Sequence, residues 1–171
     1  MNSHRVALIA VVLSAGAASA MAPAGVDAAG SPDACALLSQ AEIGAMLGVA
    51  VDPGERLLPN EPRFCTWREH GKDPMKARNV RLSLLSDREY NIGKTPLPTV
   101  TRTPESGLGD EAYFSKAKGM VFNLSVRKGT TYFRVQARSN PEAFAKSNTD
   151  AIDQKDKEID LAVARALIKK L

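Results

Sequence analysis

The sequence predicts an α+β fold: an antiparallel β-sheet with an N-terminal and a C-terminal helix packed on one face, closed by one disulfide. Three observations support this class. A capped helix pattern covers residues 40–47, several segments between residues 64 and 138 alternate apolar and polar side chains, and residues 151–170 carry an apolar stripe at helical spacing. Strands with one apolar face need a cover, and helices at the two ends of the chain can provide it.

The helix at residues 40–47 has the clearest local signal. Ser39 and Glu42 fit a capping box, in which each side chain binds a free backbone N–H at the start of a helix. Gly48 follows the apolar stripe and is a natural left-handed stop. The pattern therefore predicts a helix that begins just after Ser39 and ends before Gly48.

Strands are predicted on both sides of a polar loop. Residues 49–51 are expected to begin one strand and residues 64–67 to form another. Residues 80–84 alternate apolar and polar side chains, the period of a strand with one buried face. Residues 96–104 contain three prolines and are predicted to be an extended connection.

A β-hairpin is predicted from residues 120–127 and 131–138. We place a two-residue turn at 128–129, where glycine supplies the positive φ that tight hairpins require. Leu124 then faces Phe133, and one register sorts both strands into an apolar and a polar face.

The chain is predicted to end in a helix over residues 151–170. Its apolar stripe consists of Ile152, Ile159, Val163, Ala166 and Leu167. Acidic residues lie early and lysines late, which is the favourable sense for the helix dipole. Before it, Asn140-Pro141 is expected to start a short helical turn through Ala145.

The first 20 residues have the pattern of a secretory signal peptide. Arg5 precedes an apolar run over residues 6–15, and residues 18–20 offer a small-x-small cleavage site. The run is roughly half of the ~20 residues needed to cross a bilayer, and no other run approaches that length. We expect a periplasmic or secreted protein without a transmembrane segment, with a flexible lead-in over residues 21–32 and one domain over residues 33–171.

Two cysteines, Cys35 and Cys65, are the only ones in the chain. In an exported protein they predict one disulfide, which would close a loop of about 30 residues and stabilise the fold by about 3–4 kcal/mol in the chain-entropy model. A redox or metal-binding pair is the alternative, but there is no C-x-x-C motif. Trp67 is expected to pack against the bridge; otherwise it would be an exposed stacking residue for a sugar or peptide.

The middle of the chain is basic, with 16 Lys/Arg against 8 Asp/Glu over residues 56–138. The predicted register collects polar side chains on one sheet face: Arg81, Ser83, Asn123, Ser125, Arg127, Tyr132, Arg134, Gln136 and Arg138. Arginine forms bidentate contacts with carboxylate or phosphate. Candidate contacts for an acidic protein or an anionic envelope component are therefore Arg81, Arg127, Tyr132, Arg134 and Arg138. A plain solvated sheet face is the alternative, and export argues against nucleic acid.

Enzymatic function has weaker support, and we expect a non-enzymatic protein. A small periplasmic hydrolase would use His70 as a general base with Glu69 or Asp110, but no nucleophile-elbow pattern is present. Residues 107–113 suit a tight turn better than a cation site. No cofactor or metal is predicted, and a structural or accessory module without a ligand is a third class.

Taken in order, these motifs resemble a broad group of small exported bacterial domains of unknown function. The resemblance is carried by residues 35–42 with Gly48, by Cys65-Thr66-Trp67, by residues 107–112, and by the hairpin and terminal helix. Many members look like lipoproteins, whereas this chain lacks the lipobox cysteine. The resemblance covers nearly all of the predicted domain; it implies export, the disulfide and the α+β fold, and supplies no catalytic residues.

Overall fold

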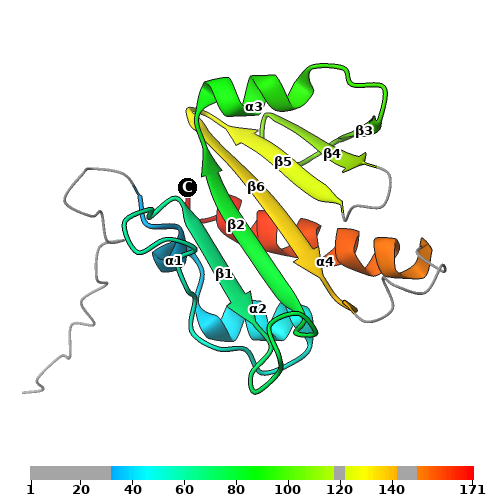
Figure 1. The fold of residues 1–171 in the computed structure, drawn as a ribbon. Helices are drawn as coiled ribbons and strands as arrows, with labels where there is room; N and C mark the ends of the chain where they lie inside the picture. The colour runs from blue at the N-terminus through cyan, green and yellow to red at the C-terminus, as the bar shows by residue number, and fades with distance from the viewer. Residues whose placement is uncertain (1–31, 118–121, 142–149) are drawn as a thin grey trace, which may run out of the picture.

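A computed structural model describes residues 32–117, 122–141 and 150–171 and confirms the α+β class (Figure 1). Its strands form one antiparallel sheet in the order β1-β2-β6-β5-β4-β3. The predicted signal peptide lies outside the described residues. The elements are α1 (Ala34–Leu37), α2 (Gln40–Leu47), β1 (Phe64–Arg68), β2 (Asn79–Leu85), α3 (Asp87–Lys94), β3 (Val100–Glu105), β4 (Glu111–Ala117), β5 (Asn123–Lys128), β6 (Thr131–Arg138) and α4 (Asp150–Ile168).

The hydrophobic core lies between one face of the sheet and three helices. Figure 1 shows α4 running across the sheet behind β6, with α1 and α2 behind β1 and β2. Buried side chains of α2 and α4 meet the apolar face of the strands, as the alternation predicts. The fully buried members of this core include Ile43, Trp67, Leu82, Leu124, Phe133, Val135, Ile159, Val163 and Leu167. None of the helices within the described ranges is long and apolar enough to cross a membrane.

The predicted N-terminal helix is confirmed as α2. Ser39 Oγ accepts from the backbone N of Glu42, and the Glu42 carboxylate accepts from the backbone N of Ser39 at 2.7 Å. Gly48 takes a φ of +69° and ends the helix in the left-handed conformation. Lys170, beyond the end of α4, donates to Glu42 at 2.9 Å and to the carbonyl of Leu37 at 3.0 Å, so the two ends of the chain are joined.

The β5–β6 hairpin exists, but its predicted register is wrong by two residues. Leu124 pairs with Val135 instead of Phe133, because the two loop residues are Gly129 and Thr130. Gly129 has a φ of +57° at the first loop position, as a type II′ turn requires. Moving the turn by one residue shifts each pairing by two, so every side chain stays on its predicted face.

Two carboxylates of α4 accept backbone N–H groups at the end of β6. Ala137 lies opposite the position just before β5 begins, so its N–H has no strand partner there. Instead it donates to Asp160 Oδ1 at 2.7 Å, and the N–H of Ser139 donates to Asp156 Oδ1 at 2.7 Å. Both carboxylates are buried. These acids thus satisfy backbone donors as well as suiting the helix dipole.

The bridge between Cys35 and Cys65 is present and ties α1 to β1. Trp67 is only 1% exposed, so the exposed stacking role is wrong for this residue. A Cβ placed on Gly54 would lie 2.7 Å from both the Cys65 sulfur and the Trp67 indole nitrogen. The indole and the sulfur therefore meet at one glycine, which supports packing of the tryptophan beside the bridge.

Other local expectations are corrected. Residues 49–51 form no strand, only an isolated bridge between Val51 and Glu69. The predicted connection over residues 96–104 contains most of β3, and helices α1 and α3 were not predicted. The helical turn predicted from Asn140 through residue 145 falls largely outside the described residues.

Candidate functional site

The polar face of the sheet carries a second layer that the sequence did not reveal. Helix α3 lies over one end of this face, where Tyr90 packs against Tyr113 and Tyr132 with ring centroids 5.5 and 5.3 Å apart. Arg102 of β3 donates to the carbonyl of Gly93 at 2.7 Å and ties the helix down. Burial raises the pKa of Tyr90, so this tyrosine is a packing group. Part of the predicted binding face is therefore covered.

The five candidate contacts do not form one patch. Arg127 lies beside Glu111, with Nε 3.7 Å from its carboxylate, and Tyr132 packs under Tyr90. A hydrogen bond between Tyr132 and Asp87 of α3 raises the pKa of the tyrosine, which further engages it with the helix. Arg127 and Tyr132 are thus occupied within the fold.

Arg138 is also separated from the rest. It pairs with Asn79 at the far end of β6, and its positive charge acts on the buried carboxyl of Asp156. Burial raises the pKa of Asp156, the net effect despite that nearby charge. Arg138 accordingly belongs with the carboxylates of α4 and not with a shared site.

Arg81 and Arg134 are the two candidates that the fold brings together. Arg81 lies opposite Gln136 and Ser83 lies opposite Arg134, so the arginines are diagonal neighbours on β2 and β6. They share the lining of a hollow of about 240 Å³ on the polar face. We call this the Arg81/Arg134 hollow; its lining residues are Leu57, Phe64, Cys65, Thr66, Arg81, Leu82, Ser83, Asn123, Arg134 and Gln136.

The lining of the Arg81/Arg134 hollow contains no acidic residue. Arg134 Nε donates to Ser125 Oγ at 3.3 Å, a neutral partner, and Gln136 Nε2 donates to Asn123 Oδ1 at 3.0 Å. Within the described ranges neither Arg81 nor Arg134 has a carboxylate partner. The hollow therefore combines two guanidinium groups with neutral hydrogen-bonding side chains.

This lack of a counter-charge sets the two arginines apart from many others in the chain. Arg56 binds Asp33 at 2.6 Å, Arg63 binds Glu61 at 3.0 Å, and Arg68 binds Glu55. Arg78 and Arg127 also lie against carboxylates. Arg81 is exposed and Arg134 is half-buried. Because guanidinium groups without an anion retain unused donors, the hollow is suited to a carboxylate or phosphate from outside.

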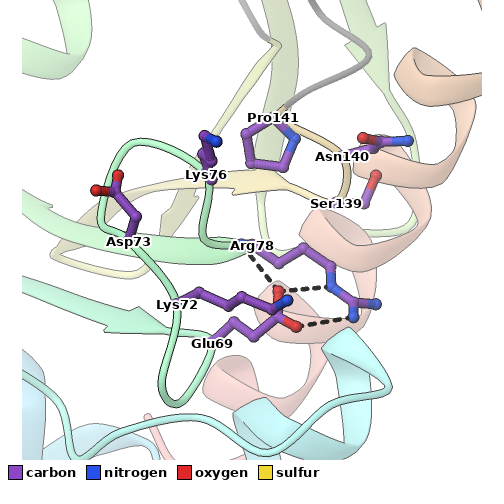
Figure 2. Close-up of a pocket in the computed structure, with 8 residues that line it drawn as sticks. All are labelled: Glu69, Lys72, Asp73, Lys76, Arg78, Ser139, Asn140 and Pro141. Atoms are coloured by element: carbon purple, nitrogen blue, oxygen red, sulfur yellow. Dashed lines mark hydrogen bonds and ion pairs between the residues drawn. The ribbon is translucent and has the colours of Figure 1, made fainter.

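A larger hollow of about 490 Å³ lies where β2 begins and β6 ends (Figure 2). Its charges largely neutralise one another: Glu69 accepts from Arg78 Nε at 2.9 Å and from Nη2 at 3.0 Å. This pairing lowers the pKa of Glu69. Lys72 and Lys76 stand on its rim with Asp73. The two hydrogen bonds to Glu69 occupy the guanidinium group of Arg78, which an anion would need for a two-point contact.

The components of the alternative hydrolase are dispersed. His70 Nδ1 lies 2.5 Å from Asp52, and both side chains are largely exposed. Neither expected carboxylate reaches it, because Glu69 pairs with Arg78 and Asp110 accepts from the N–H of Gly129 at 2.6 Å. His70 lines neither hollow.

The acidic turn over residues 107–113 serves the fold. Gly107 and Gly109 have φ values of +72° and +63°, and the carboxylate of Asp110 fastens the β5–β6 turn. No group of three or more His, Cys, Asp or Glu side chains in the described part of the chain is arranged to hold a metal ion.

Sequence reasoning missed two features that shape the site. Leu57 borders the Arg81/Arg134 hollow from a loop with no periodic pattern, so no sequence signal connects it to the sheet. Helix α3 did have a signal, because Ser86 and Glu89 form the same capping box as the first helix. No protein-family model, curated protein or solved structure matches this chain significantly.

Proposed function

We propose that this protein is an exported, non-enzymatic binding protein of the bacterial envelope, and that it binds an anionic group of its partner in the Arg81/Arg134 hollow. One observation carries the proposal: two neighbouring arginines without a carboxylate partner among the described residues line a hollow that contains no acid. An acidic protein and an anionic envelope component both provide the required group. Planar guanidinium groups bind carboxylate and phosphate in two-point contacts, which gives orientation as well as affinity.

The arrangement favours binding over a purely structural role. A solvated sheet face also carries arginines, but several arginines with structural roles on this protein lie against acids, as Arg63 and Arg78 do. Arg134 is half-buried, and the one hydrogen-bond partner of its side chain among the described residues is the Ser125 hydroxyl. Leaving such a group without a counter-ion is unfavourable unless a ligand supplies one.

The test is a titration of the purified protein with two small anions, glutarate and hydrogen phosphate, at low salt. Nuclear magnetic resonance follows the side-chain N–H signals of every arginine. We expect the largest shifts at Arg81 and Arg134, with millimolar affinity because a single anion makes few contacts. The Arg81→Gln/Arg134→Gln variant should lose this response.

A matched control keeps the test specific. Arg165→Gln/Lys169→Gln removes the same charge from exposed positions at the end of the chain, on or just beyond α4. This variant should bind both anions as the wild type does. If the shifts centre on Arg78 in the larger hollow, the anions bind elsewhere and the proposal is wrong. If both double variants weaken binding equally, the anions respond to net charge and the proposal is also wrong.

A further inference from the structure

We infer, resting on the proposed anion site, that the partner is a protein segment carrying a carboxylate beside an apolar side chain, and that Leu57 and Leu58 bind the apolar side chain. The carboxylate enters the Arg81/Arg134 hollow while the neighbouring side chain covers the two leucines. The proposed surface therefore combines the Arg81/Arg134 hollow with an apolar edge formed by Leu57 and Leu58.

The size of the hollow limits what it can hold. At about 240 Å³ it lies below the range of roughly 300–1,000 Å³ that is typical of pockets for whole small molecules. A single acidic side chain fits this space, and the rest of the molecule that carries it must lie on the surrounding surface. The hollow is therefore better matched to part of a macromolecule than to a complete metabolite.

The surrounding surface includes two exposed leucines. Leu57 lines the hollow and is 62% exposed, and the adjacent Leu58 is 61% exposed. Arginine is enriched in protein interfaces, and the buried centre of an interface is more apolar than the rest of the surface. Covering both leucines would add a hydrophobic contribution to the charge pairing.

The loop that carries the leucines is held in place from both sides. Arg56, just before Leu57, binds Asp33 at 2.6 Å and donates to the carbonyl of Pro59 at 3.3 Å. After the loop, Cys65 is fixed by its disulfide. Since these contacts order the loop before binding, less conformational entropy is lost when a partner covers it.

The charges around the leucines favour a protein over a lipid surface. Recognition of anionic membranes usually uses a cluster of about 4–8 lysines and arginines. Here Glu55 and Glu61 stand on either side of the leucines and pair with Arg68 and Arg63. Two arginines set in a hollow provide a local point of attachment, which an acidic protein side chain matches.

The test selects peptides from a random 12-residue display library on the full chain. We expect enriched sequences to contain Asp or Glu within a few residues of a large apolar residue. Affinities of the selected peptides are then measured by isothermal titration. Arg81→Gln/Arg134→Gln should abolish binding, and Leu57→Ser/Leu58→Ser should weaken it about tenfold and remove the preference for the apolar residue.

A matched control and a vesicle assay make the outcome decisive. Met75→Ser/Leu97→Ser removes exposed apolar side chains from outside the hollow, and it should leave peptide affinity unchanged. Acidic peptides that bind through the arginines but ignore the leucines would overturn this inference and leave the anion site standing. Selected peptides that bind the wild type and Arg81→Gln/Arg134→Gln with equal affinity would overturn both the anion site and this inference.

Failure to select any peptide would overturn the inference that the partner is a protein segment. The glutarate titration would decide separately whether the anion site exists. Binding to phosphatidylglycerol vesicles that depends on both Leu57 and Arg81 would assign the surface to a membrane instead.

Discussion

Replacing Asp160 with asparagine tests whether α4 uses a buried acid to bind a backbone N–H at the end of β6. Asp160 is 0% exposed, and its Oδ1 accepts the backbone N–H of Ala137 at 2.7 Å. Burial raises the pKa of Asp160 well above its usual 3.8, the bond from Ala137 opposes that rise in part, and Asp156 adds to it. Asparagine keeps an acceptor oxygen for Ala137 but cannot ionise.

The sign and size of the effect follow from the proton balance. Because the folded state holds the proton of Asp160 more tightly than the unfolded chain, its stabilising contribution is complete below a pH of about 3.8. The contribution is then lost as the pH rises toward the folded-state pKa. Each pH unit in this window corresponds to about 1.4 kcal/mol. The free energy of unfolding of Asp160→Asn should therefore rise relative to the wild type by about that amount per unit, then level off.

The assay is urea unfolding of both proteins at intervals between about pH 4 and pH 8. Comparing the two proteins at each pH removes the contributions of acids that do not interact with Asp160, which leaves Asp156 as the coupled group. Glu158→Gln, an exposed acid on the same helix, should show no such slope. Asp156→Asn should show the same sign, since burial also raises the pKa of Asp156. A difference between Asp160→Asn and wild type that stays constant with pH would refute the reasoning.

Two further predictions concern the contacts that join distant parts of the chain. Reduction should lower the melting temperature of the wild type, which loses about 3–4 kcal/mol, and should hardly affect a folded Cys35→Ala/Cys65→Ala variant; equal losses would mean that the reductant acts elsewhere. Hydrogen bonds from Lys170 and from Ser39 lower the pKa of Glu42 to about 2, so the stability from these bonds is present above about pH 4.5 and is lost as the pH falls through about 2. Lys170→Met should therefore destabilise the protein at pH 7 and much less near pH 2, measured by urea unfolding; a cost independent of pH would contradict the pairing.

The parts predicted correctly are those governed by neighbours in the chain. The capping box at Ser39 and the left-handed Gly48 fixed both ends of α2. Alternation assigned the faces of β2, β5 and β6, because side chains on a strand alternate regardless of which strand lies beside it. Arg81 and Arg134 could therefore be placed on one polar face in advance.

The register of the hairpin needed more than its own residues. Turns at 128–129 and at 129–130 both preserve the two faces, so the alternation does not distinguish them. In the fold, β6 also pairs with β2, where Phe133 lies opposite Leu84. Pairing on both sides of β6, together with glycine at the first loop position, fits the observed turn.

The sequence by itself determined the α+β class, the cysteine pair, and a polar sheet face rich in arginine. The tertiary structure alone decided which of those arginines stand together. Tyr90 brings α3 over Tyr132, the carboxylates of α4 lie at the end of β6 beside Arg138, and a distant loop places Leu57 beside Arg81. These contacts join residues far apart in the chain, so no local pattern encodes them. Propensity and periodicity act over a few residues, whereas a binding surface is assembled by long-range packing.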